Sequence, residues 1–315
     1  MTDLPAFLDT SRPDVPDLSV PRGVLPFYLP NRPVRGRLVR LGPLAATLLS
    51  RHEHAPPVKV LLGQALALAA ALATALKFTG SFSVQARGKG LVPMLVTDCT
   101  ETGALRGYVR VTDDAEIPAA ATARDLLGDG YLAFTVDQGL NKEPTQGIVS
   151  IEGESLADMA AHYFSTSEQL GAKIFLAAGD TPHGWRASAL VLERVAGAGG
   201  IDPALSQAEQ DDSWATAAML AATITEAELL DDTLTPEHLL YRLFGAEGVA
   251  AAKPRPLSFG CRCSRQRLGG ILEGFSTDDL DHMAIEGEIK MTCEFCNFAF
   301  CFTRSTITGR PGDQT

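Results

Sequence analysis

The longest apolar stretch of the chain runs from Val60 to Leu76, between Lys59 and Lys77. It reads VLLGQALALAAALATAL, and alanine supplies much of it. A membrane-spanning helix needs about 20 apolar residues. Because this stretch is short and rich in alanine, we predict a helix over residues 58–77 that is buried in the core of a globular domain.

From Gly80 the apolar positions alternate over short runs that are separated by glycine-containing turns, which is typical of an antiparallel meander. An earlier alternating run, RGRLVR at residues 35–40, predicts one more strand, and a short helix is expected over Pro43–Arg51. A further helix is expected over residues 155–170, with Ser155 as its N-cap. The later strand candidates are SFSVQARGKG, PMLVTDCT, LRGYVRVTD, GYLAFTVDQG, TQGIVSIEG, AKIFLAAG and WRASALVLERV.

Beyond residue 195 the pattern becomes weaker. Residues 196–212 have the glycine, proline and acidic content of a linker. Ser213–Leu230 is rich in Ala and Thr, so any helix that it forms has little apolar face and should be only marginally stable. A better helix is expected after Thr235, the predicted N-cap, with an apolar stripe made by Leu239, Leu240, Leu243 and Phe244.

These patterns predict an α+β protein, in which an antiparallel β-rich N-terminal domain with a long buried helix is followed by a helical linker and a small C-terminal domain. The expected organisation is an irregular lead-in (1–33), the α+β core (34–195), the acidic linker (196–250), a small C-terminal domain (251–305) and a flexible tail (306–315). The N-terminus lacks the basic and apolar regions of a secretory signal, so a cytoplasmic location is expected.

Charge is distributed unevenly. The net charge of −11 argues against general nucleic-acid binding. Residues 197–250 hold ten acidic residues and one arginine, whereas residues 251–267 hold five basic residues and no acidic one. Both segments are readily explained as solvated faces. A further hypothesis is that the acidic linker docks on the basic segment.

Five of the six cysteines lie between Cys261 and Cys301. Four of them form a CxC pair and a CxxC pair, separated by 29 residues: Cys261, Cys263, Cys293 and Cys296. Four thiolates are the tetrahedral ligand set that zinc prefers in structural sites. Iron–sulfur clusters also use four cysteines, but their usual spacings differ. The sequence therefore predicts one zinc ion, which makes residues 251–305 a small C-terminal zinc-binding domain, called the zinc domain below. A plain structural zinc clip is the simplest interpretation of it.

The first pair also suggests redox chemistry. Nearby Arg262, Arg265 and Arg267 should favour thiolates, which are the species that oxidants attack. Four cysteines allow three pairings. Closure between nearest neighbours would join Cys261 to Cys263 and Cys293 to Cys296. Because metal supplies much of the folding free energy of a small zinc module, its loss should unfold that module.

The two remaining cysteines have a simpler interpretation. Cys99 ends a predicted strand, and Cys301 lies in a run of aromatic residues. Both are expected to be buried apolar side chains, although Cys301 could also serve as a spare ligand or resolving thiol.

With these motifs in place, the sequence resembles the 33 kDa heat shock protein family of redox-regulated holdase chaperones. The resemblance runs from about residue 35 to residue 305. It is carried by LLGQALALAAALATALKFTGSFSVQARGKG, GYLAFTVD, QGIVSIEGESLADMAAHYFSTSEQL, TPEHLLYRLF, FGCRCSRQR and CEFC.

The resemblance implies a chaperone that is inactive while zinc occupies the four cysteines. Oxidant and unfolding stress would then form the two neighbouring disulfides and release the zinc. The linker, Ser213–Gly245, would unfold, and the protein would dimerise and bind unfolded client proteins without ATP. No enzymatic activity, nucleic-acid partner or membrane partner is implied.

Two other classes of protein fit the sequence less well. A zinc-ribbon-like module for nucleic acid or transcription machinery would normally need two CxxC knuckles, whereas the first pair here is CxC. A thiol oxidoreductase that uses Cys293 and Cys296 would need a surrounding βαβ pattern, which the sequence lacks.

Overall fold

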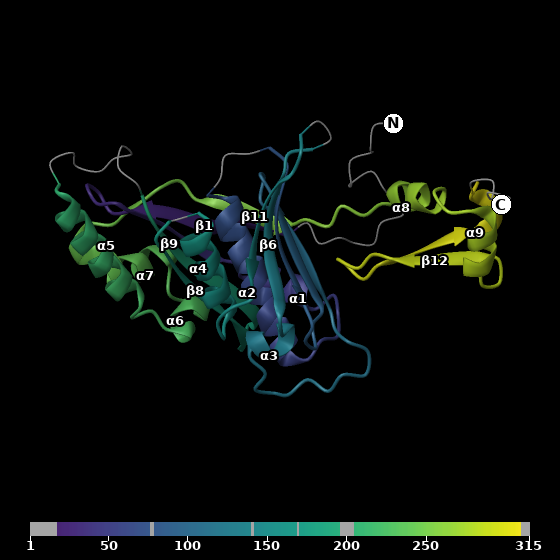
Figure 1. Ribbon diagram of the computed structural model, residues 1–315, viewed down its shortest axis with the longest axis horizontal. Coiled ribbons are helices and arrows are strands. Elements are labelled where there is room, and N and C mark those ends of the chain that lie inside the picture. Colours follow the sequence, from purple (N-terminus) through teal and green to yellow (C-terminus); the bar gives the residue numbers. More distant parts are fainter. Residues whose placement is uncertain (1–17, 76–78, 140–141, 169, 196–204, 310–315) are drawn as a thin grey trace. The chain divides into compact units, whose positions relative to one another are not determined.

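The structure is a computed structural model that describes residues 18–75, 79–139, 142–168, 170–195 and 205–309. The chain divides into two compact units between Gly260 and Cys261. The larger, Leu18–Gly260, is called the sheet unit here, and the smaller, described over residues 261–309, is called the cysteine unit. Figure 1 shows both units and labels their helices and several of their strands.

One large sheet organises the sheet unit. Within the described residues its strand order is β7-β6-β3-β4-β5-β11-β1-β2-β9-β8, with β10 paired to β1. Neighbouring strands are antiparallel, except that β11 runs parallel to β5. The predicted strands of residues 35–40 and 81–195 are confirmed. The bounds are β1 Ser19–Tyr28, β2 Val34–Arg40, β3 Ser81–Gly88, β4 Met94–Thr100, β5 Ala104–Arg110, β6 Gly130–Asp137, β7 Thr145–Ser150, β8 Ala172–Thr181, β9 Gly184–Arg194, β10 Ala250–Ala251 and β11 Arg255–Phe259.

The predicted core helix is confirmed as α2, Pro56–Ala73. It contacts strands from both halves of the sheet order, including β3, β4, β8 and β9. Among the described helices, α2 alone has the length and apolar composition of a membrane span, and 72% of that apolar window is buried inside the structure. An all-round apolar helix is what such a central position requires.

Three shorter helices accompany α2: α1 Pro43–Leu49, α3 Ala123–Leu127 and α4 Leu156–Thr166. As predicted, Ser155 is the N-cap of α4. Its hydroxyl accepts a hydrogen bond from the Asp158 backbone N–H, and the Asp158 carboxylate accepts one from the Ser155 N–H. This reciprocal capping box satisfies two helix-end donors.

The linker lies against the other face of β2, β8 and β9, where it forms α5 Gln207–Ala221, α6 Glu226–Leu230 and α7 Pro236–Phe244, followed by the 3₁₀ turn η2 Gly245–Glu247. Successive strand residues point to opposite faces. Val39 and Val191 therefore join the core around α2, while Leu38 and Leu190 join a second core with the helices of the linker. In that second core the rings of Phe27 and Phe244 stack at 5.5 Å.

The linker helices differ in how they are held. In α5 the buried residues are small, namely Ser213, Ala217 and Ala221. In α7 the predicted N-cap Thr235 accepts a hydrogen bond from the His238 N–H, and the predicted stripe is buried. The sequence thus correctly distinguished a helix with a weak apolar face from one with a strong apolar face.

Two predicted boundaries were wrong. Part of the expected irregular lead-in is strand β1, which pairs with β2, β10 and β11 and buries Val24, Leu25 and Phe27. Pro21 and Pro26 hid this strand, because proline is rare inside sheets. Residues 250–251 and 255–259, expected in the linker and zinc domain, are strands of the large sheet. Residues 1–17 and 310–315 lie outside the described residues.

The acidic linker also pairs differently from the docking hypothesis. Asp211, Asp232, Glu237 and Glu247 form ion pairs with arginines of the sheet unit. From the basic segment, Arg255 donates hydrogen bonds to the carbonyls of Thr74 and Glu101. These four linker acids therefore have arginine partners within the sheet unit, and the docking hypothesis stays a prediction for the basic residues of the cysteine unit.

The cysteine unit has little apolar interior. It contains α8 Arg265–Leu272, α9 Thr277–Met283, the hairpin of β12 Glu288–Thr292 and β13 Ala299–Thr303, and the short turn η3 Arg304–Thr306. Its large buried apolar side chains, within residues 261–309, are Leu272, Leu280, Ile289, Phe300 and Phe302. A core of this size rarely stabilises a fold without help from a metal or a crosslink.

Candidate metal centre

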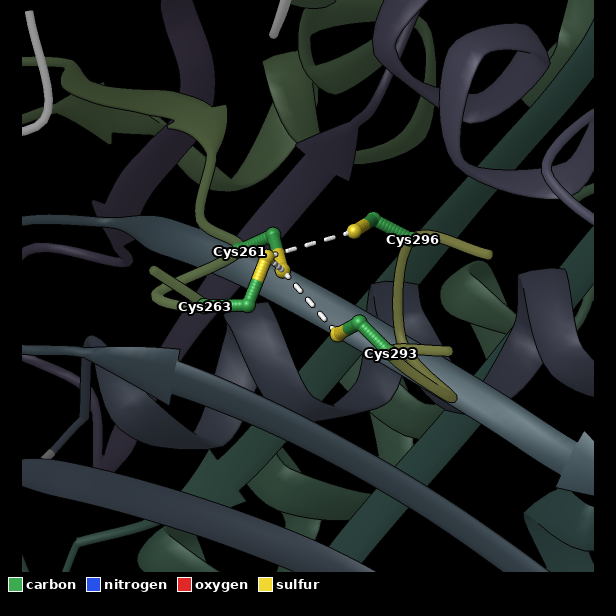
Figure 2. A group of neighbouring side chains, drawn as sticks. All are labelled: Cys261, Cys263, Cys293 and Cys296. Atoms are coloured by element: carbon green, nitrogen blue, oxygen red, sulfur yellow. Dashed lines mark hydrogen bonds between the residues drawn. The ribbon is translucent and has the colours of Figure 1, made fainter. Parts of the chain in front are cut away.

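The four predicted cysteines converge in the cysteine unit (Figure 2). Their sulfur atoms all lie within 4.8 Å of one another, although the two pairs are separated by 29 residues of sequence. The Cys261 sulfur lies 3.4 Å from that of Cys263 and 3.7 Å from that of Cys293, and the sulfurs of Cys263 and Cys296 are 3.5 Å apart. All four thiols are free of disulfide bonds.

The CxC pair lies in the segment that joins β11 to α8. Ser264 ends this segment as the N-cap of α8, and its hydroxyl accepts a hydrogen bond from the Arg267 N–H at 3.1 Å. The sulfurs of Cys261 and Cys263 lie beside each other, and each also lies within 3.7 Å of a sulfur of the second pair. Both side chains of the CxC pair are therefore directed toward the second pair.

The CxxC pair is held by the turn between β12 and β13. The Cys293 N–H donates to the Phe298 carbonyl at 2.8 Å, and the Asn297 N–H donates to the Cys293 carbonyl at 2.7 Å. Asn297 takes a left-handed conformation, with φ of 55°, which asparagine tolerates better than most residues. This tight turn brings Cys296 back beside Cys293.

The sulfur arrangement fits a tetrahedral metal ion. Zinc–thiolate bonds of about 2.3 Å place the sulfurs of a tetrahedral site about 3.8 Å apart, which is close to the 3.4–3.7 Å separations here. Cys261, Cys263 and Cys296 are buried and Cys293 is partly exposed. An all-sulfur, mostly buried donor set is typical of closed zinc sites. The four cysteines can therefore hold one metal ion.

Hydrogen bonds among the four thiols shift their pKa values in opposite directions. A hydrogen bond from Cys261 lowers the pKa of Cys263 to about 7, and hydrogen bonds from Cys261 and its neighbours lower the pKa of Cys293. The same contacts raise the pKa values of Cys261 and Cys296. Each thiol thus influences the protonation of the others, and a bound cation would favour the thiolate form of all four.

The arginines contribute less directly than expected. The largest influences on the cysteine pKa values are the other cysteines. Arg265 stacks its guanidinium 4.9 Å from the Phe302 ring centre and donates to the Cys301 carbonyl at 2.8 Å. Its position supports the hairpin that carries the second cysteine pair.

The two other cysteines lie apart from this cluster. Cys99 is buried in β4, as predicted. Cys301 is exposed, so the expectation of a buried side chain was wrong. On β13 the alternation buries Phe300 and Phe302 and turns Cys301 outward, in register with Lys290.

Comparisons with known proteins agree with this arrangement. The family model described as "Hsp33 protein" matches residues 23–303, which is most of the chain. The chain belongs to the Hsp33 family. A "33 kDa chaperonin" of Caulobacter vibrioides is 41% identical over 86% of this chain and 91% of its own length. One from Pseudomonas syringae pv. tomato is 36% identical over 93% and 94%.

A solved Hsp33 structure supports the fold. The crystal structure of the 33 kDa chaperonin of Thermotoga maritima matches with a TM-score of 0.74, covering 91% of this chain and 96% of that one at 22% identity. The Hsp33 relatives are named chaperonins rather than enzymes. This chain is therefore a chaperone of the Hsp33 family, and its four-cysteine cluster suits zinc and redox chemistry.

Proposed function

We propose that this protein is a redox-regulated holdase, inactive while reduced and metal-bound, that binds unfolded client proteins under combined oxidative and unfolding stress. The observation that carries the proposal is the convergence of four cysteine sulfurs, none in a disulfide bond, within 4.8 Å in a member of the Hsp33 family. It acts without ATP, in the cytoplasm, and forms a homodimer on activation.

In the resting state Cys261, Cys263, Cys293 and Cys296 hold one zinc ion. The bound ion would supply a crosslink between the CxC segment and the β12–β13 turn. The small core of the cysteine unit makes this crosslink important for its stability.

Activation is oxidation of the four thiolates by peroxide. Each disulfide requires two thiolates, one hydrogen peroxide and two protons, and yields one disulfide and two water molecules. The proposed products are Cys261–Cys263 and Cys293–Cys296, with zinc released. Because all four sulfurs lie within 4.8 Å, every pairing is within reach after small movements. The neighbouring pairs are proposed from the family resemblance.

The structural output is release of the linker. From the linker the chain continues through β10 and β11 directly to Cys261, so unfolding at the cysteines begins next to the strands that follow the linker. Since α5 buries mainly small side chains, its docking should be the weakest of the long linker helices. Its departure with α6 and α7 would expose the second core to clients.

The test measures zinc release and suppression of client aggregation in the same samples, before and after peroxide at elevated temperature. We expect one zinc ion released per chain and aggregation suppression that appears only after treatment. Equal suppression by the untreated and treated protein would contradict the switch. Peptide mapping of the oxidised chain identifies which of the three pairings forms.

A matched pair of variants completes this test. Cys261→Ser should lose zinc and suppress aggregation without peroxide, because the crosslink is gone. Cys301→Ser removes the exposed thiol outside the cluster and should behave as the wild type.

A further inference from the structure

The face of the sheet beneath the linker has an unusual charge composition. On β2, β8 and β9 the residues that alternate toward α5–α7 include Arg40, Lys173, Arg186 and Arg194, around the apolar Leu38 and Leu190. All residues of these three strands are described, and none that alternates toward this face is acidic. The opposite face, by contrast, carries Glu193 and Asp180.

Four arginines of the sheet unit bind linker carboxylates. Arg186 on β9 donates to Asp232 at 2.6 Å, with only 8% of the arginine side chain exposed. Arg194, at the end of β9, pairs with Asp211.

The N-terminal side of the sheet supplies two more pairs. Arg32, in the β1–β2 turn, lies 2.6 Å from Glu247, and Arg22 on β1 pairs with Glu237. Arginines from β1, from its turn to β2 and from β9 thus surround the apolar centre of the face.

A fifth arginine holds the backbone of the linker. Arg40 donates to the carbonyls of Glu228 and Asp231, each at 2.8 Å, and to that of Leu234. These carbonyls lie at the end of α6 and in the loop before α7. Because a carbonyl is present at every residue, Arg40 can hold any segment that ends a helix at this position.

We infer that this arginine-ringed face selects client segments that combine an apolar stripe with acidic flanks, and that the linker is its internal occupant. The inference rests on the proposed holdase function. Apolar contacts at Leu25, Leu38, Leu190 and Leu192 provide affinity, while the arginines discriminate by charge. The linker has this composition itself, with ten acidic residues in 197–250.

A preference for acidic segments is the opposite of what the overall charge of the chain predicts. A chain of net charge −11 should attract basic segments. Release of the linker would add to that tendency by freeing its carboxylates. A preference for acidic segments would therefore have to come from the local arginines.

The experiment uses the full-length protein after peroxide and heat, with three fluorescent amphipathic peptides of about 18 residues, or five helical turns. All share one apolar stripe, and their other positions are Glu, Gln or Lys. Anisotropy should show the Glu peptide binding at least about fivefold more tightly than the Lys peptide at low salt. The difference should shrink toward about 0.5 M salt.

Variants locate the source of the preference. The double variant R186Q/R194Q and, separately, Arg32→Gln on the exposed turn should each lower the Glu-to-Lys affinity ratio, the double variant by about threefold or more. Arg242→Gln is the matched control. It breaks the Arg242–Glu228 ion pair inside the linker and leaves the sheet face unchanged.

Equal binding of the three peptides, or an unchanged ratio in the arginine variants, would overturn the charge selection while leaving the holdase function intact. Loss of all peptide binding together with absence of aggregation suppression in the treated wild type would overturn both.

Discussion

Ser188 on β9 donates a hydrogen bond from its hydroxyl to the Leu229 carbonyl in α6 at 2.7 Å. Ser188 is 2% exposed, and Leu229 is buried in the second core. This hydrogen bond joins β9 to α6 and involves no charged group. Its loss therefore reports on linker docking independently of the arginine ion pairs.

Replacing Ser188 with Ala should weaken linker docking. The change leaves the Leu229 carbonyl buried without this donor, at a cost of about 1–3 kcal/mol. Hydrogen exchange of residues 226–244 should accelerate, and the temperature needed for activation by peroxide should fall. Ser50→Ala, which removes an exposed hydroxyl at the end of α1, is the control and should change neither measurement.

Removing metal from the reduced protein should unfold the cysteine unit and leave the sheet unit folded. The buried side chains of residues 261–309 are few, whereas α2 and the large sheet have an extensive core of their own. A chelator titration followed by amide NMR should show loss of dispersion for residues of β12 and β13 but not for those of β3 and β4. Retention of both sets of signals would contradict a structural role for the metal.

The Glu193 carboxylate should be a major contributor to the stability of the sheet unit. It accepts hydrogen bonds from Arg35 and Arg37, each at 2.7 Å, and Arg37 is nearly buried. Glu193→Gln would leave the Arg37 charge without its counterion, which costs about 3–5 kcal/mol for a buried pair. Urea unfolding of the reduced protein measures this loss, and Glu154→Gln at the exposed start of α4 should be nearly neutral.

His54 should make the stability of the sheet unit depend on pH. Burial, with smaller contributions from the charges of His52 and Lys59, lowers its pKa from 6.5 to about 4. The unfolded chain therefore binds a proton that the folded chain does not. The stabilisation from neutral His54 is fully present above about pH 6.5 and is lost as the pH falls toward 4.

His54→Gln tests this dependence, because it removes the titrating group and should flatten the decline of the unfolding free energy over that pH range. His183→Gln, at an exposed loop histidine, should leave the wild-type slope unchanged. An identical slope in the wild type and His54→Gln would show that other groups cause the decline.

The prediction of secondary structure succeeded where one local pattern decided the element. The uncharged run of α2, the alternation of β3 to β9 and the N-caps Ser155 and Thr235 were all identified from sequence. It failed for β1, because Pro21 and Pro26 obscure the alternation and only pairing with β2 and β11 makes this segment a strand. Pairing partners distant in sequence leave no local signal.

For the metal centre, cysteine spacing was sufficient to select four residues as one set, because few other chemistries use two close cysteine pairs. The exposure of Cys301 was missed, since a run of aromatic residues does not show which of its members faces outward. The arginines that bind the linker were missed for a related reason. Arg32, Arg40, Arg186 and Arg194 are spread over more than 160 positions of sequence and meet the acidic segment only when β2 and β9 are adjacent.

The sequence by itself determined which four cysteines form one cluster, where the buried helix lies, and the contrast between the weak helix α5 and the well-packed helix α7. Each depends on a short local motif or pattern. Only the tertiary structure decided which face of the sheet the linker covers and which charges it meets there. That outcome depends on strand order and register, which set the facing side of every residue on β2, β8 and β9.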